Sequence, residues 1–157
     1  MYPEIYKLYN CEKSDLVNLQ QKLKDEVLSQ DHIETLKTKP WWTDNHYVLQ
    51  LNLEKICPET HLVSVPWDSD SLKWLLEGGI LTISRKDNVI FTPMATSSCH
   101  DNCEDLLRSG KIIKYYTGYA LSCDRLWRYH SWGITSDNKI VETTQPRIAY
   151  LSNESYE

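Results

Sequence analysis

From residue 112 onward the chain is a succession of short segments rich in aromatic and β-branched residues. Such residues fit a pleated, half-buried surface and therefore predict strands. A helix precedes them, because Ser97 or Ser98 can cap a segment that runs from Cys99 to about Arg108. Helices followed by a run of strands predict an α+β fold with an antiparallel sheet, on which this helix packs. The strands are expected over 112–116, 118–122, 126–135, 139–144 and 147–151.

The N-terminal part shows both helical and strand periodicity. Leucines at three- and four-residue spacing predict a helix from Ser14 to about Leu36. Strict alternation predicts a strand from Tyr47 to Leu53. We expect one domain, in which residues 1–60 form a helical and strand addition to a core over 61–157. That core should begin with a strand over 61–65, a helix over 71–77 and a hairpin of 80–84 and 88–92 around Arg85-Lys86-Asp87.

Charge and hydropathy exclude some classes of partner. The 157 residues include 17 basic and 22 acidic side chains, which give a formal net charge of −5. Without a basic excess, we do not expect nucleic acid as the main partner. The chain has no apolar run that approaches the roughly 20 residues of a spanning helix, and it does not start like a secretory signal. We therefore expect no membrane partner, and either a cytoplasmic location or export as an effector without a cleavable signal.

The odd number of cysteines argues against a disulfide framework, because Cys11, Cys57, Cys99, Cys103 and Cys123 are irregularly spaced. A free thiol with a function is one interpretation, and inert buried thiols are the other. Cys99 is distinguished by its place at the start of a predicted helix, where unpaired N–H groups and the helix dipole favour a thiolate. The same N–H groups can stabilise an oxyanion.

A thiol nucleophile needs a base and a group that orients the base. His130 lies in one predicted strand and Glu142 in the next. If the turn between them is Ser136-Asp137-Asn138, His130 lies opposite Thr144, and Glu142 is one diagonal step away on the same face, at about 7–8 Å between Cβ atoms. A turn of two or four residues would put Glu142 on the opposite face, and Asp137 is then the alternative orienting acid.

A Cys at a helix start, a His on a strand and an acid on the next strand form an order that resembles the papain-like thiol-enzyme superfamily. That group includes transglutaminases, cell-wall amidases of the NlpC type and toxin glutamine deamidases. The resemblance covers about residues 95–150 and implies acyl transfer at an amide or ester, with no cofactor. It implies Cys99 as the nucleophile, His130 as the general base and then acid, and Glu142 as the orienting residue. The papain-type sequence around the nucleophile is absent, and no Gln upstream of Cys99 stands out as an oxyanion donor.

Four neighbouring residues are candidates for substrate or oxyanion binding. Ser98 directly precedes Cys99, and Asn102 lies on the Cys99 face of the helix, where its amide can serve an oxyanion or satisfy the loop. Trp132 shares the face of His130, where it either walls a cleft that keeps water out or packs within the sheet. Arg128 shares that face too, and it either binds a substrate carboxylate or pairs with Glu142.

We therefore expect a cysteine-dependent hydrolase or acyltransferase, without a metal or other cofactor, that acts on an amide in a protein, a peptide or a small molecule. Peptide cleavage, deamidation and transglutamination differ only in the leaving group and the acceptor. The alternative is a non-catalytic binding module with an aromatic-rich sheet. In that alternative zinc stabilises the fold through Cys99, Cys103, Cys123 and His130, with or without His100.

Overall fold

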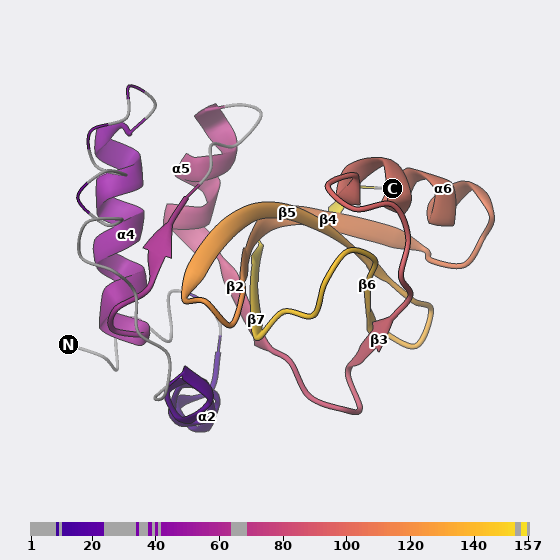
Figure 1. Ribbon diagram of the computed structural model, residues 1–157, viewed down its shortest axis with the longest axis horizontal. Coiled ribbons are helices and arrows are strands. Elements are labelled where there is room, and N and C mark those ends of the chain that lie inside the picture. The colour runs from indigo at the N-terminus through magenta and orange to yellow at the C-terminus, as the bar shows by residue number, and fades with distance from the viewer. Residues whose placement is uncertain are drawn as a thin grey trace.

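The expected combination of helices with a mostly antiparallel sheet is confirmed (Figure 1). The computed structural model describes residues 11–23, 42–63, 69–152 and 155–156, together with Tyr9, Glu34, Thr38 and Pro40. Its helices are α2 (Lys13–Leu23), α4 (Asp44–Ile56), α5 (Ser69–Gly78) and α6 (Cys99–Arg108). Its strands are β1 (His61–Leu62), β2 (Ile80–Ile83), β3 (Val89–Phe91), β4 (Lys114–Leu121), β5 (Leu126–Ile134), β6 (Ile140–Glu142), β7 (Ala149–Ser152) and β8 (Ser155–Tyr156).

The strands form one eight-stranded sheet in the order β2-β7-β4-β5-β6-β3, with β1 paired to β5 and β8 paired to β4. β4 and β5 are the longest strands, and together they arch over the shorter strands (Figure 1). β4 is continuous where two strands were expected. The pairing is antiparallel except for β1 with β5 and β3 with β6, which are parallel.

The strand expected from Tyr47 to Leu53 is wrong, because this segment belongs to α4. The buried positions of α4 follow the helical period and include two polar residues, His46 and Gln50. Gln50 is buried because its amide binds the backbone of the next strand: Oε1 accepts from the Leu62 N–H at 2.9 Å, and Nε2 donates to the Thr60 carbonyl at 2.5 Å. A polar residue on the inner face hides the helical pattern in the sequence.

The hairpin expected around Arg85-Lys86-Asp87 is also wrong, although both of its strands exist. β2 pairs with β7 and β3 pairs with β6, so the two strands lie at opposite ends of the sheet order. The turn between them is held locally, since Asn88 accepts from the Arg85 N–H at 2.6 Å and donates to the Ile83 carbonyl at 3.0 Å. Local turn chemistry is therefore compatible with strand partners that are far away in the sequence.

The helix expected from Cys99 to about Arg108 is confirmed. The first predicted helix is confirmed over Lys13–Leu23, and most of its expected continuation to Leu36 lies outside the described residues. The remaining strand predictions hold with ends shifted by a few residues, and positions 64–65 of the strand expected over 61–65 lie outside the described residues.

Two hydrophobic clusters hold the helices on the sheet. The larger one joins the inner faces of α2, α4 and α5 to β2, β4, β5 and β7, and Trp127 lies within it. The smaller one joins Cys103 and Leu106 of α6 to Tyr115 and Val141. Figure 1 shows α4 and α5 on one side of the arched strands and α6 above the other side. Cys103 is thus a core residue, one of the inert buried thiols that the cysteine pattern allows.

We predict that Gly118→Ala destabilises the fold, because a Cβ at Gly118 would overlap with the Leu151 carbonyl oxygen of β7. Overpacking against backbone costs about 1–3 kcal/mol, which lowers the Tm of a chain of this size by about 2–10 °C. Gly78→Ala is the matched control, since nothing lies within 4 Å of the Cβ it would add. Thermal melts of both variants test this packing, and equal Tm values for the two would contradict it.

Candidate active site

Cys99 is the first residue of α6, and it is half-buried. Burial disfavours its thiolate, yet the pKa of Cys99 lies below the ordinary thiol value. The causes are a hydrogen bond and a charge interaction with His130, together with backbone hydrogen bonds from Ser131 and His100. The helix start and the facing strand β5 therefore both contribute to stabilising a negative charge on this sulfur.

The other buried or half-buried thiols behave in the opposite way. Burial raises the pKa of Cys11 to about 11 and those of Cys57 and Cys103 to about 12. These groups stay protonated at neutral pH and are inert as nucleophiles. Among these four thiols, only Cys99 has an environment that favours the reactive form.

His130 lies in β5 with 3% of its surface exposed, and it connects Cys99 to Glu142. Its Nε2 lies 2.9 Å from Oε1 and 3.1 Å from Oε2 of Glu142. Burial disfavours the imidazolium, but hydrogen bonds to Cys99 and Glu142 raise the pKa of His130 above its ordinary value. Since Nε2 is occupied by the carboxylate, Nδ1 is the nitrogen available to the thiol.

The contact between His130 and Glu142 follows from the expected register. Gly133 pairs with Val141 and Ile134 with Ile140, so the turn has three residues, as predicted. Asn138 adopts the left-handed conformation, with φ of 64°, which this turn requires. Asp137 stays in the exposed turn, where its side chain is 65% exposed and contacts Thr135 and Lys139. Glu142, and not Asp137, is the acid that reaches His130.

Glu142 is fully buried and held by several donors. Besides His130, it accepts from Tyr150 Oη at 2.9 Å, from the Thr144 N–H at 3.0 Å and from Thr144 Oγ1 at 3.1 Å. Arg147 Nε lies 3.9 Å from Oε1 and adds a compensating positive charge. Burial alone would raise the pKa of Glu142, but His130 and the other donors lower it below the ordinary value. The carboxylate is therefore ionised and fixed in orientation.

Three of these supporting residues, Thr144, Arg147 and Tyr150, are not among the site residues that the sequence predicts. Thr144 is two residues after Glu142, and this spacing is compatible with a side chain that caps the carboxylate. The sequence around Tyr150 contains no pattern that indicates a contact with Glu142. It reaches Glu142 because β7 pairs with β4 and the sheet curls, and neither fact is visible in the sequence.

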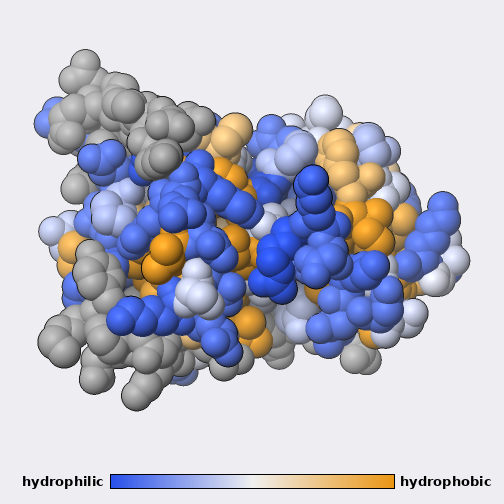
Figure 2. Space-filling view, turned by 90° about the horizontal axis from the view of Figure 1, so that it is seen from below, coloured by the Kyte–Doolittle hydropathy of each residue, from blue (hydrophilic) through white to orange (hydrophobic). Residues whose placement is uncertain are grey.

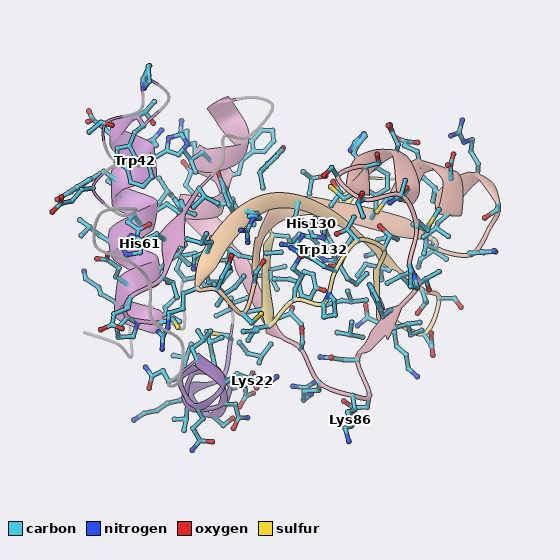
Figure 3. All side chains as sticks on the ribbon, in the orientation of Figure 1. Lys22, Trp42, His61, Lys86, His130 and Trp132 are labelled. Atoms are coloured by element: carbon cyan, nitrogen blue, oxygen red, sulfur yellow. The ribbon has the colours of Figure 1, made fainter. Side chains whose placement is uncertain are left out.

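Trp132 lies behind His130. Its ring is stacked on the imidazole with centroids 6.1 Å apart, and it contacts the Tyr150 ring at 4.8 Å. Figure 3 shows His130 and Trp132 side by side beneath the arch of β5. Trp132 is only 2% exposed and belongs to a buried cluster with Ala120, Ile134, Ile140 and Tyr150. It therefore supports the imidazole from the core side, so of the two roles that the sequence leaves open Trp132 has sheet packing and not the cleft wall.

A surface cleft of about 340 Å³ gives access to Cys99 and His130. Its other walls come from the loop before α6 and from the chain around Thr144 and Arg147. Arg128 also lines the cleft, but it does not pair with Glu142 as one expectation had it. Its guanidinium binds Asp124 at 2.8 and 3.1 Å and the Ser122 hydroxyl at 2.9 Å. Arg147 is the arginine that lies beside Glu142.

Asn102 and Ser98 shape the loop before α6. The Asn102 amide donates to the Ala95 carbonyl at 2.8 Å and to Thr143 Oγ1 at 3.2 Å, which ties this loop to the end of β6. Both hydrogen bonds use the donor end of the amide. Asn102 therefore holds the loop, and its amide N–H groups are not directed at an oxyanion. Ser98 is the N-cap residue of α6, and its hydroxyl donates to the Thr96 carbonyl at 3.4 Å. Ser98 also lines a small depression of about 140 Å³ next to Cys99.

The zinc site weighed from the sequence is not assembled. Within the described part of the chain, no three Cys, His, Asp or Glu side chains converge in an arrangement that could hold a metal ion. The His100 ring lies against the Tyr115 ring, with centroids 5.3 Å apart, and His100 Nε2 lies 3.8 Å from Glu104 Oε1. Cys103 is enclosed in the smaller core cluster.

Comparisons of the chain with protein-family models, with curated proteins and with solved structures found no match. In addition, none of the helices in the described ranges has the length and apolar character needed to cross a bilayer.

We predict that Glu142→Gln lowers the pKa of His130. The substitution keeps the shape of the side chain but removes the negative charge that favours the imidazolium. NMR titration of the His130 ring signals should show the midpoint moving to lower pH. Asp137→Asn is the matched control, because Asp137 lies in the exposed turn, and it should leave the midpoint unchanged. An unchanged His130 midpoint in Glu142→Gln would contradict the contact.

Proposed function

We propose that this protein is a thiol-dependent hydrolase or acyltransferase that attacks an amide carbonyl through Cys99, His130 and Glu142. One observation carries the proposal: a hydrogen-bonded chain runs from a half-buried thiol at a helix start, through a histidine, to a buried carboxylate. Perturbed pKa values at a surface cleft are typical of catalytic sites. Each group also has the pKa direction that its role requires.

The proposed reaction begins with attack of the Cys99 thiolate on the carbonyl carbon, which forms a tetrahedral intermediate. Backbone N–H groups at the start of α6 are the donors best placed for its oxyanion, because their dipoles gather there. The His130 imidazolium then gives its proton to the leaving amine, and the C–N bond breaks to leave a thioester on Cys99. Water, deprotonated by His130, hydrolyses the thioester. With an amine in place of water, the same step is acyl transfer.

Glu142 is the positioning residue in this scheme. It receives the Nε2–H of His130, keeps Nδ1 directed at the thiol and stabilises the imidazolium. Arg147, Thr144 and Tyr150 keep Glu142 ionised and immobile. Removal of the negative charge should therefore reduce the rate without displacing the nucleophile.

The order of the three residues along the chain supports a papain-like thiol enzyme, as the resemblance implied. Within that proposal the substrate is an amide of a protein, a peptide or a small molecule, and the reaction is peptide cleavage, deamidation or transglutamination. All five cysteines are free, which fits a reducing compartment, and we therefore propose a cytoplasmic location.

The direct test is acylation of the enzyme. We expect an activated ester such as p-nitrophenyl acetate to transfer its acetyl group to Cys99, observed by intact-protein mass spectrometry with peptide mapping. Cys99→Ala should abolish the adduct, and His130→Ala should slow its formation by about 10²–10⁴-fold. Cys123→Ala removes an exposed cysteine and should change nothing. Acylation that persists in Cys99→Ala would overturn the mechanism.

Amide turnover then separates catalysis from binding. We expect a panel of peptides with reporter amide bonds and with glutamine side chains to yield free amine or ammonia in a Cys99-dependent manner. Ammonia release identifies deamidation, and release of the reporter amine identifies peptide cleavage. Peptides that bind the cleft without either product, together with an absence of acylation, would favour the non-catalytic binding module.

A further inference from the structure

A second cavity, larger than the cleft at Cys99, lies between α2 and the turn that ends α4. Its volume is about 590 Å³, within the roughly 300–1,000 Å³ that small-molecule sites occupy. Gln20 of α2 donates to the Ile56 carbonyl at 3.1 Å and ties the two elements together at this point. On the face that carries α2, Figure 2 shows hydrophobic side chains surrounded by hydrophilic ones.

Part of the cavity lining is apolar. Leu16, Leu23 and Cys57 line it and are almost completely buried, while Val17 lines it with 48% of its surface exposed. A ligand that enters the cavity therefore covers apolar surface with its own apolar body.

Arg125 brings a buried positive charge to this apolar cavity. It is 6% exposed and lines the cavity from the turn between β4 and β5. Its Nη1 donates to the Pro58 carbonyl at 3.1 Å. None of the residues that the structure describes accepts a hydrogen bond from its Nε–H. The guanidinium is therefore an incompletely compensated buried charge, which is costly, and a negatively charged group in the cavity would offset it.

The backbone holds Arg125 in this position. Its N–H donates to the Ser122 carbonyl, and its own carbonyl accepts from the His61 N–H, both at 3.0 Å. Its φ of 68° lies in the left-handed region, which few residues other than glycine adopt. The guanidinium is therefore presented by a fixed turn.

The other charges at the cavity are Lys13 and Glu59, both exposed at the rim. Their opposite charges lie in water and largely offset each other. The buried charge of Arg125 therefore determines which class of ligand the cavity prefers. That preference is for one negative group attached to an apolar body.

We propose that this cavity binds a medium-chain carboxylate, whose acid group accepts from Arg125 and whose alkyl chain lies along α2. The site shares no lining residue with the cleft at Cys99. A negative result for this cavity would therefore leave the proposed catalytic function unaffected, and the reverse also holds.

The test measures binding of three probes by isothermal titration calorimetry on the full chain. Decanoate should bind, decanol should bind about tenfold or more weakly because it lacks the charge, and acetate should not bind because it lacks the apolar body. Arg125→Gln should remove the preference for decanoate over decanol. Equal affinities for decanoate and decanol, or no binding of decanoate, would overturn the proposal.

A surface variant keeps the test decisive if Arg125→Gln fails to fold. Val17→Glu places a negative charge at the mouth of the cavity and should weaken decanoate more than decanol. Val48→Glu is its matched control, because Val48 is 45% exposed on α4 and does not line the cavity. Decanoate binding that is the same in Val17→Glu and Val48→Glu would contradict the site.

Discussion

The buried carboxylate of Glu142 is the constraint on which the site depends. An ionised side chain with no exposed surface is destabilising unless its oxygens are paired, and breaking such a pair typically costs about 3–5 kcal/mol. The partners come from His130 of β5, from Thr144 just beyond β6 and from Tyr150 of β7. β7 is separated from β5 by β4, so these groups meet only because the sheet curls. The curl of the sheet therefore brings together the groups that favour the ionised form of Glu142.

The fixed carboxylate has consequences for the thiol. With Nε2 of His130 bound to Glu142, the other ring nitrogen serves Cys99, and Trp132 stacks against the ring from the core side. The pKa of Cys99 is lowered while burial raises those of Cys11, Cys57 and Cys103. The protein thus favours the thiolate form at the cysteine that faces the cleft.

The parts of the site that are close in the sequence could be predicted from it. The helix over Cys99–Arg108 was predicted with these bounds, although its N-cap residue Ser98 makes no side-chain capping hydrogen bond. The turn at Asn138 sets a register in which Glu142 reaches His130. The register could be derived because the side-chain period of a strand is two. A three-residue turn places Glu142 on the face of His130, whereas a turn of two or four residues would place it on the opposite face. These features depend on contacts between neighbours in the chain.

Features that depend on side-chain contacts or strand pairings outside the local pattern could not be predicted. Gln50 gives α4 the alternating pattern of a strand, because it is a polar residue on the buried face of the helix. It is buried there because its amide binds the backbone of Thr60 and Leu62. The strands β2 and β3 have hairpin-like sequences but pair with β7 and β6. Tyr150 reaches Glu142 through the order of the sheet. For β2, β3 and Tyr150 a pairing between distant segments decides the outcome, and for Gln50 a side-chain contact with the following strand does; local propensity encodes neither.

The pH dependence of Cys99 alkylation is the measurement that tests this account most directly. Iodoacetamide modifies thiolates, and mass spectrometry reports the rate at each cysteine, with exposed Cys123 as the internal reference. We expect Cys99 to react faster than Cys123 and to continue to react below about pH 7. His130→Ala should move the midpoint of the pH–rate profile of Cys99 up toward about 8.5. A wild-type Cys99 that reacts slowly, with a midpoint near about 8.5, would contradict it.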